Sequence, residues 1–408
     1  MSTPTGARRP CPCCANGLWS PLLDFGVVPA SGTFRNRASD PVRQIALSFE
    51  LCPSCGLVRQ ASEEAGRDYL TVDRATMNQF PSYGEAILSR LRRMAPSDAS
   101  VLEIGANDGA FLEKLRGVGF SRLVGVEPSR LLAKTAEKRG FRIVNDYFNS
   151  TTVFSLMESS GAFNLIVCRH TLEHARDPLD FLRAIRACLD PAAGVALIEV
   201  PDASIIPEQT RVHELWDEHT LYLASSNLSL LVERAGMTVF DLEVRTHLDT
   251  RNLVAWCRPN GNHAIPMRQP NGCAVAMLWA RLPAAWARYQ KRLASTLVAA
   301  PRPLYVAGAA HPQCNFVNFA SLGELVDFFI DDDPNKISRI PPVFGHPRII
   351  STVQFERTST QGTLVLTGFG YPNWQRRLTQ HALNRGLRVL DPNQFKDLDL
   401  RRQDRSLG

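Results

Sequence analysis

One segment, residues 99–129, constrains the fold of this chain more than any other: ASVLEIGANDGAFLEKLRGVGFSRLVGVEPS. VLEI reads as a buried strand, GANDG as a turn of small residues, FLEKLRGV as a helix and RLVGVE as a second strand. A strand, a tight turn, a helix and a strand in this order predict an α/β fold with a parallel sheet. Such a sheet binds its ligands at the carboxyl ends of its strands.

The turn after the first strand has the form ExGxxxG. Gly105 and Gly109 allow the backbone to approach a ligand closely, and Glu127, at the end of the second strand, is placed to bond ribose hydroxyls. The turn is a poor match to the dinucleotide fingerprint GxGxxG and suits a nucleoside without a pyrophosphate, such as S-adenosylmethionine (SAM). The predicted cofactor-binding residues of this segment are Glu103, Gly105, Asn107, Asp108, Gly109 and Glu127.

The same alternation continues through residues 141–202. FRIVNDYF contains a further candidate cofactor-binding residue, Asp146. It is followed by a strand NLIVC, a polar loop RHTLEH, an amphipathic helix DPLDFLRAIRACL and a strand VALIEV. Because RHTLEH comes directly after a strand, we expect His170, Glu173 and His174 to face the cofactor. The alternative for His174 is a histidine at a helix start that is satisfied by the backbone.

The N-terminal region is rich in cysteine. The chain has ten cysteines. Two CxxC pairs, Cys11 with Cys14 and Cys52 with Cys55, predict a tetrahedral zinc site with four thiolate ligands, and Cys13 is left over. Four sulfur ligands leave the ion no open position, so its role is structural. The alternatives are a redox CxxC, which needs only one pair at a helix start, and disulfides, which the cytosol disfavours.

Residues 216–223, WDEHTLYL, gather three polar side chains, Asp217, Glu218 and His219, shortly after the strand LIEV. Two interpretations are open. The segment forms part of an active site, or it is the solvated start of a helix whose two carboxylates lie near the positive end of the helix dipole.

The last third reads as another α/β unit. Residues 260–272, NGNHAIPMRQPNG, are typical of a linker, and we expect the helical stretch after them to be interrupted at Pro283. PLYVAGAA, ELVDFFIDDD and GTLVLTGFG read as strands, and the tail FKDLDLRRQDRSLG as frayed. Two roles are open for Gly308 to Ala310: they bind a nucleotide, or the unit only shapes the cleft.

Composition limits the class of protein. With 44% hydrophobic and 21% charged residues among 408, the chain should fold into two or three domains. No apolar run reaches the roughly 18 residues of a membrane span, and the N-terminus lacks the apolar core of a signal peptide. We therefore expect a cytoplasmic protein without a membrane partner. The net charge of +6 is not gathered into a basic block, so no nucleic-acid partner is expected.

Together these motifs give the chain a family likeness. It resembles the nucleotide-sugar C-methyltransferases, bacterial enzymes that methylate a carbon of a ketosugar. The motifs that carry the resemblance span nearly the whole chain: CxxC…CPxCG, EIGANDGAFL, GVEPS, RHTLEHARDP, IEVPD, DEHTLYL and LYVAGAAHPQCNFVNF…VDFFIDDDPNK. The resemblance implies a zinc-binding domain (1–75), a class I SAM-dependent methyltransferase domain (76–258) and a Rossmann-like α/β domain (273–408).

The sequence departs from that family where the substrate should lie. The family's catalytic stretch has the form Tyr-His-Glu-His; here only Glu218 and His219 match. Its His-Gly-Gly-Ser-x-Arg stretch is here HLDTR, in which His247 and Arg251 remain while both glycines are gone. The lysine that follows its Gly-Ala turn is missing from GAAHPQCN. The substrate is therefore a ketosugar, or another compound with an acidic C–H bond.

The resemblance also implies a mechanism. His219 acts as the general base that removes a proton beside a ketone, since an imidazole titrates near neutral pH. Glu218 orients the imidazole, and Arg251 or His247 stabilises the developing oxyanion. The resulting enolate attacks the methyl group of SAM. The small-molecule substrate is the expected partner, and the chain is a monomer or a homodimer.

Three other functions remain open. The first is a SAM-dependent enzyme that methylates oxygen, nitrogen or carbon of a different small molecule. The second is a protein that binds SAM without methylating a sugar. The third is a zinc-dependent nucleic-acid binder, which would bind oligonucleotides with a steep salt dependence.

Overall fold

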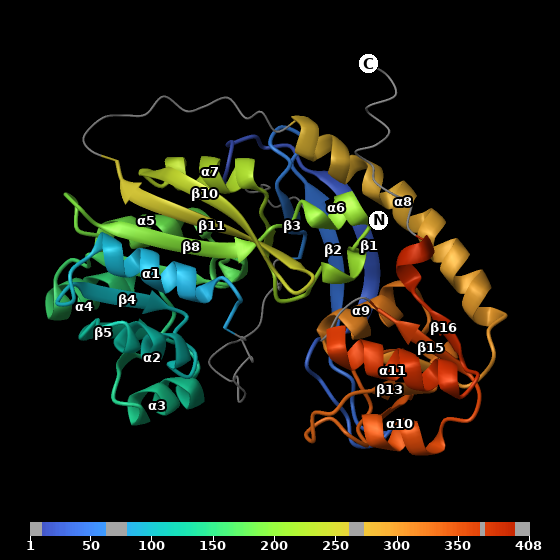
Figure 1. The fold of residues 1–408 in the computed structure, drawn as a ribbon. Coiled ribbons are helices and arrows are strands. Elements are labelled where there is room, and N and C mark those ends of the chain that lie inside the picture. Colours follow the sequence, from blue (N-terminus) through green and yellow to red (C-terminus); the bar gives the residue numbers. More distant parts are fainter. Residues whose placement is uncertain (1–9, 63–79, 261–272, 368–371, 396–408) are drawn as a thin grey trace.

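The computed structural model describes residues 10–62, 80–260, 273–367 and 372–395. Three β-sheets organise these residues, and Figure 1 shows the strands of the N-terminal sheet standing between the central and the C-terminal sheets. Most of the predicted linker (261–272) and of the predicted tail (396–408) lies outside the described residues, as does the domain boundary expected at residues 75 and 76.

The central sheet has seven strands in the order β10-β11-β8-β7-β4-β5-β6. Strands β5, β6, β7 and β8 run parallel to β4, whereas β11 pairs antiparallel with both β8 and β10. The chain order reverses beside β4, which is where doubly wound sheets bind their ligands. The bounds are β4 Ser100–Ile104, β5 Arg122–Val126, β6 Arg142–Val144, β7 Leu165–Arg169, β8 Val195–Pro201, β10 Met237–His247 and β11 Thr250–Pro259.

Helices cover both faces of this sheet. Apolar residues of α1 and α2 pack into a core on one face, and those of α4, α5 and α7 pack into a core on the other. This arrangement and the strand order are those of a class I methyltransferase, so the predicted α/β class is confirmed. The helices are α1 Gly84–Met94, α2 Ala110–Gly117, α3 Arg130–Lys138, α4 Ser150–Ser160, α5 Pro178–Cys188, α6 Ile205–Gln209 and α7 Ser225–Arg234, with 3-10 turns at Leu172–His174 and Val212–Glu214.

The N-terminal sheet includes one strand from the central part of the chain. Its antiparallel order is β1-β2-β3-β9, with β1 Ser20–Pro29, β2 Gln44–Leu51, β3 Val58–Gln60 and β9 Leu221–Tyr222. Tyr222 of β9 pairs with Val58 of β3. WDEHTLYL therefore runs from a loop into a strand, and the interpretation of it as a helix start is wrong.

The C-terminal sheet is parallel throughout, in the order β14-β13-β12-β15-β16. Its strand order agrees with the predicted Rossmann-like unit. The bounds are β12 Leu304–Ala307, β13 Phe328–Ile330, β14 Arg348–Ile350, β15 Thr363–Leu366 and β16 Arg388–Leu390, with helices α9 His311–Phe319, α10 Thr352–Thr358 and α11 Pro372–Asn384.

Helix α8, Cys273–Val298, contains Pro283 but remains one helix of 26 residues. The prediction of an interruption at Pro283 is therefore wrong. A proline inside a helix costs about 3 kcal/mol, and burial of large side chains on either side of it outweighs that cost. Trp279, Leu282, Trp286, Tyr289, Leu293 and Leu297 are all buried.

The same buried residues of α8 join two parts of the molecule. They belong to one core together with Phe49 and Leu51 of the N-terminal sheet and Leu304 and Val306 of the C-terminal sheet. In Figure 1 the helix runs along the outer side of both sheets. Helix α8 therefore helps to hold the C-terminal unit against the N-terminal sheet. Among the described residues, no helix is long and apolar enough to span a membrane.

We predict that Trp279→Ala lowers the free energy of unfolding by about 3–5 kcal/mol, because it opens a cavity in this shared core. Met277 lies on the same helix and is 47% exposed; Met277→Ala should change stability by less than about 0.5 kcal/mol. Urea unfolding of both variants checks the prediction. Equal losses in the two variants would contradict the packing described for α8.

Candidate active site and metal centre

The predicted cofactor turn lies at the carboxyl end of β4. Gly105 has a φ of 76° and Gly109 a φ of 82°, values that residues with a side chain rarely adopt. A Cβ atom added at Gly105 would lie 2.4 Å from the hydroxyl oxygen of Thr171. The turn therefore depends on glycine to bring its backbone this close to the RHTLEH loop.

Glu127 follows β5 and holds the turn from the neighbouring strand. Its carboxylate accepts the backbone N–H groups of Asn107 and Ser129, each at 2.8 Å. Burial raises the pKa of Glu127, and the two N–H donors oppose that rise. The carboxylate is thus held against the turn, at the end of the second strand where such a group bonds ribose hydroxyls.

Asp108 and Asp146 lie along the same edge of the sheet. The Asp108 carboxylate pairs with Arg139 at 2.7 Å. Asp146 is exposed after β6, and its carboxylate accepts the N–H of Tyr147 at 2.7 Å. Because β4, β5 and β6 are parallel, the structure gathers all the candidates from Glu103 to Asp146 at one sheet edge.

Glu103 is the unusual member of this group. The side chain is 4% exposed, and its Oε2 atom has no hydrogen-bond partner among the described residues. Burial raises the pKa of Glu103 to about 8; the positive charge of Arg169 lowers it, and the charges of Glu127 and Asp108 add to the rise. A buried carboxyl that lacks a partner at a ligand-binding edge fits a site that receives a cationic group.

The imidazole of His170 lies between two buried carboxylates. Its Nδ1 is 3.6 Å from Glu173, and its Nε2 is 3.5 Å from Glu199 of β8. Burial acts to lower the pKa of His170, but hydrogen bonds and the charges of both carboxylates raise it to about 9. His170 is therefore an imidazolium near pH 7 and is already protonated, so it does not serve as a base.

Glu199 was missed by the sequence analysis. It is 0% exposed, accepts the hydroxyl of Tyr83 at 2.6 Å and pairs with Arg169. Asn252 of β11 in turn donates to the Tyr83 hydroxyl at 2.7 Å. A glutamate inside the apolar strand VALIEV was the available signal, because a buried charge needs partners.

The histidine pair is the most distinctive feature of this edge. The rings of His174 and His219 have centroids 4.8 Å apart, and one ligand atom from each lies within 4.8 Å of a Glu173 carboxylate oxygen. Burial lowers the pKa of both histidines, and their mutual repulsion lowers it further for His219. Both imidazoles are therefore neutral near pH 7.

Backbone pairing brings His219 to His174. The N–H of Thr220 donates to the carbonyl of Glu173 at 2.8 Å, and its hydroxyl reaches the carbonyl of Ala175 at 2.9 Å. The Nδ1 of His174 lies 2.8 Å from the backbone oxygen of Glu218. Since a carbonyl only accepts, His174 donates there, which places its proton on Nδ1.

Residues 216 and 217 fix the loop to the other two units. The Asp217 carboxylate accepts the Ser31 N–H at 3.1 Å and also its hydroxyl, and the Ser31 hydroxyl lies 2.9 Å from Nδ1 of His311 in α9. The ring centroids of Trp216 and His311 are 4.0 Å apart. No sequence pattern pointed to Ser31 or His311, because they come from distant parts of the chain.

The remaining substrate candidates have other partners. Arg251 contacts Asp202 at 2.7 Å, Glu208 at 3.0 Å and the Ser204 hydroxyl at 2.6 Å. The Nδ1 of His247 accepts the N–H of Ser82 at 3.1 Å. Within the described ranges, neither side chain bonds to His219, so the structure does not bring them into the histidine cluster.

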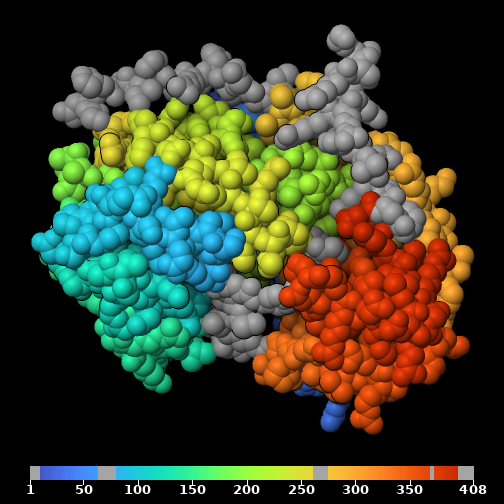
Figure 2. Space-filling model, in the orientation of Figure 1, coloured from blue at the N-terminus to red at the C-terminus, as the bar shows by residue number. Residues whose placement is uncertain are grey.

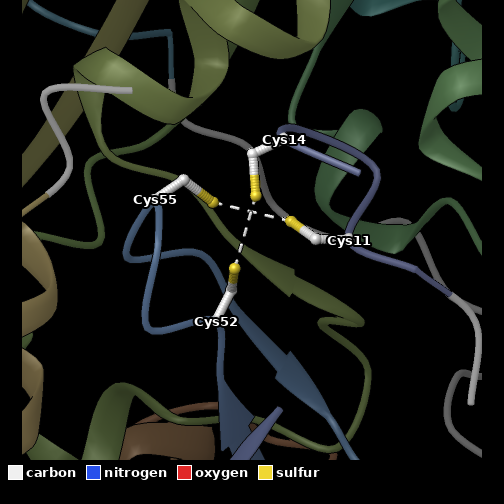
Figure 3. A group of neighbouring side chains, drawn as sticks. All are labelled: Cys11, Cys14, Cys52 and Cys55. Carbon is white, nitrogen blue, oxygen red and sulfur yellow. Dashed lines mark hydrogen bonds between the residues drawn. The ribbon is translucent and has the colours of Figure 1, made fainter. Parts of the chain in front are cut away.

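The four predicted metal ligands converge, as Figure 3 shows. The sulfur atoms of Cys11 and Cys55 are 3.5 Å apart, as are those of Cys14 and Cys52. Bonds of 2.3 Å to one tetrahedral ion would place sulfur atoms about 3.8 Å apart. The thiol of Cys13 instead points to the carbonyl of Asn227 at 3.4 Å.

The four thiols have the donor set of a structural zinc site. Hydrogen bonds from Cys13, Cys52 and Cys55 lower the pKa of Cys11. The hydrogen bond with Cys11 in turn raises the pKa of Cys55. One thiolate therefore forms at the expense of the others unless a cation balances their charge. A divalent ion bound here would supply that balance and keep all four thiolates ionised.

The comparisons with known proteins give one family match and several distant relatives. Residues 78–242 match a family model described as a methyltransferase domain. The C-methyltransferase NovU of Streptomyces niveus is 26% identical over 241 residues, which are 57% of this chain and 56% of that protein. A tRNA U34 carboxymethyltransferase of Pseudoalteromonas translucida is 26% identical over 166 residues, 38% of this chain and 51% of that protein. The chain thus spans about half the length of these curated relatives.

A solved structure, an S-adenosylmethionine-dependent methyltransferase from Clostridium acetobutylicum, is 13% identical and covers 43% of this chain and 89% of that chain, with a TM-score of 0.34. The fold assignment rests instead on the strand order. Strand order and family match together identify residues 78–242 as a methyltransferase domain.

We predict that Glu103→Gln stabilises the protein at pH 8 by about a few kcal/mol and has little effect at pH 5. The folded state keeps the Glu103 proton up to a pKa of about 8, whereas the unfolded chain releases it near the ordinary value of 4.5. Rising pH between these values therefore costs the wild type stability that the variant keeps. Urea unfolding at both pH values measures the difference, and an equal effect at pH 5 and pH 8 would contradict the raised pKa.

Proposed function

We propose that the protein is a SAM-dependent methyltransferase that methylates a carbon of a small carbon acid, most specifically a nucleotide-linked ketosugar. The observation that carries the proposal is the pair of neutral histidines, His174 and His219, beside Glu173 at the ligand-binding edge of the methyltransferase domain. The similarity to a C-methyltransferase, although it covers about half of each chain, supports carbon as the acceptor atom.

The cofactor edge fits SAM in shape and charge. The glycines of the Gly105–Gly109 turn allow a ligand to approach the backbone closely. The Glu127 carboxylate can accept hydrogen bonds from ribose hydroxyls. The Oε2 atom of Glu103, which has no partner among the described residues, offers a place for a cationic group of the cofactor. When bound, SAM supplies an electrophilic methyl group on a sulfonium.

The histidine pair fits the proton transfer that a carbon acceptor needs. A C–H bond beside a ketone becomes nucleophilic when a base removes its proton, and His219 is neutral and able to accept it. Its lowered pKa makes His219 a weak base in isolation. The nearby Glu173 carboxylate offsets this weakness, because it stabilises the imidazolium as that charge forms.

Glu173 therefore takes the role that the sequence analysis gave to Glu218. The contact of Glu218 with the pair is made by its backbone carbonyl, which orients His174. Arg251 is held by Asp202 and Glu208, so we propose that it shapes the acceptor side of the cleft through these residues. The zinc ion proposed for Cys11, Cys14, Cys52 and Cys55 is structural, and no step of the reaction uses it.

The rival function is methylation of oxygen or nitrogen, for which His219 would deprotonate a hydroxyl or an amine. Exchange of a substrate C–H for deuterium from heavy water, without methyl transfer, distinguishes the two because only a carbon acid exchanges at carbon. The place of Trp216 and the loss of glycines between His247 and Arg251 favour an unusual ketosugar, or another carbon acid, as the acceptor.

We predict that His219→Gln lowers kcat about 10²–10⁴-fold on a ketosugar acceptor, since it removes the proton acceptor. SAM affinity should change less than about threefold, because His219 takes part in proton transfer and not in cofactor binding. Titration calorimetry with SAM and turnover on a panel of nucleotide-linked ketosugars measure both effects.

The matched control is His346→Gln, which changes an exposed histidine of the C-terminal unit and should leave both values unchanged. SAM binding without turnover on any acceptor would move the proposal to another substrate class. Absence of SAM binding by the wild type would overturn it.

A second prediction concerns the thiolate cluster. Cys52→Ser should reduce bound zinc from about one ion per chain to a small fraction, and should lower the melting temperature, because the metal contributes directly to folding. Cys188→Ser changes a cysteine buried elsewhere and should keep the zinc. Metal analysis of the purified variants gives the answer, and equal zinc in wild type and Cys52→Ser would rule out the assignment.

A further inference from the structure

His311, the first residue of α9, packs on the loop that carries the base of the proposed reaction. His311 and Asn315 are four positions apart on this helix, so their side chains share one face of it. Asn315 donates to the carbonyl of Leu215 at 2.8 Å, and the ring of His311 packs on that of Trp216. One face of α9 therefore contacts two consecutive residues of the loop.

A chain of hydrogen bonds fixes the orientation of the His311 ring. The Nδ2 of Asn315 lies 3.3 Å from Nε2 of His311. Because Nδ2 is a donor, Nε2 accepts and Nδ1 carries the proton. Nδ1 donates to the Ser31 hydroxyl at 2.9 Å, and that hydroxyl donates to the Asp217 carboxylate. Burial lowers the pKa of His311 to about 3, so the imidazole is neutral and is held at both nitrogens.

The indole of Trp216 has no comparable hydrogen bond. Its backbone is fixed, because its N–H donates to the Tyr222 hydroxyl and its carbonyl accepts from Gln60. The Nε1 atom, however, is buried and has no hydrogen-bond partner among the described residues. The orientation of the indole therefore depends on the rings nearest to it, those of His311 at 4.0 Å and His219 at 4.7 Å between centroids.

Trp216 is in turn one of the rings that pack around His219. The centroid of His174 lies 4.8 Å from that of His219, and the centroid of Tyr222 lies at 6.0 Å. His174 and Tyr222 are each hydrogen-bonded to a backbone group of the central unit. Trp216 is therefore the wall of this enclosure whose position the C-terminal unit sets.

We infer that His311 is a positioning residue for His219: its fixed ring supports the Trp216 indole, which keeps the His219 imidazole buried and in place. The inference rests on the proposed function, in which His219 is the base. It makes the C-terminal unit part of the active site, because α9 supplies the support. His311 acts through Trp216 and transfers no proton.

The first test measures the pKa of His219 by NMR on histidine-labelled protein without SAM or acceptor, with the signal assigned from its loss in His219→Gln. Burial keeps this pKa well below 6.5, and the charges of His174, His311 and His170 also lower it. In His311→Ala the indole loses its support and water reaches His219, so the pKa should rise toward 6.5.

His311→Phe is the matched variant, because it keeps a ring against Trp216 and should keep the low pKa of His219. Both variants remove the charge of His311, so a difference between them reports the ring contact alone. His346→Gln, which changes an exposed histidine of the same unit, should leave the pKa of His219 unchanged.

Catalysis gives a second readout. His311→Ala should lower kcat about 10- to 100-fold on a reacting acceptor, because a small displacement of a catalytic group costs about this much. SAM affinity should change less than about threefold, and His311→Phe should keep most of the wild-type kcat.

An unchanged pKa of His219 in His311→Ala, or an equal rise in His311→Ala and His311→Phe, would overturn the inference. If His311→Ala does not fold, ¹⁵N shifts of the wild type decide: the proton of His311 should lie on Nδ1, and a proton on Nε2 would contradict the chain. The pKa measurements use no SAM or acceptor. If they come out as expected and no acceptor is methylated, the proposed function fails while the contact through Trp216 stands.

Discussion

Hydrogen bonds from all three units hold the loop and strand at residues 215–222, and the candidate active site depends on this segment. Gln60 of the N-terminal sheet donates to the carbonyl of Trp216 at 2.8 Å, and Asn315 of the C-terminal unit donates to the carbonyl of Leu215 at 2.8 Å. Thr220 is paired with the segment that carries His174. Because backbone groups buried at such a junction must be satisfied, the loop has few alternatives, and His219 is held beside His174.

Burial then sets the electrostatic character of this edge. His170 is made an imidazolium by two carboxylates, whereas burial keeps His174 and His219 neutral. The difference arises from which neighbours each ring has, since all three lie in the same low-dielectric region. Two neighbouring loops, RHTLEH and the segment that carries His219, thus offer one positive charge and two neutral imidazoles. Figure 2 shows that the central and C-terminal units form two sides of the molecule.

The sequence alone predicted the local parts well. The glycine turn, the cysteine pairs and the alternation of strands and helices are short-range patterns whose physics acts within a few residues of chain, and the structure has them. The sequence could not predict the contacts between distant segments of the chain. The pairing of β9 with β3, and the contact of Ser31 with Asp217, join segments with no shared pattern. Pro283 was misjudged because local helix propensity ignores the buried side chains of α8, which decide the outcome.

Strand β9 has a consequence for how such a protein can vary. It belongs by sequence to the methyltransferase unit and by hydrogen bonding to the N-terminal sheet. The N-terminal unit therefore cannot be exchanged without disturbing the methyltransferase unit. A recombination that exchanged it for an unrelated zinc module would leave β9 without its neighbour and would release the histidine loop at the same time. In related proteins, substitutions in the first 60 residues should therefore be accompanied by matching substitutions in residues 215–222.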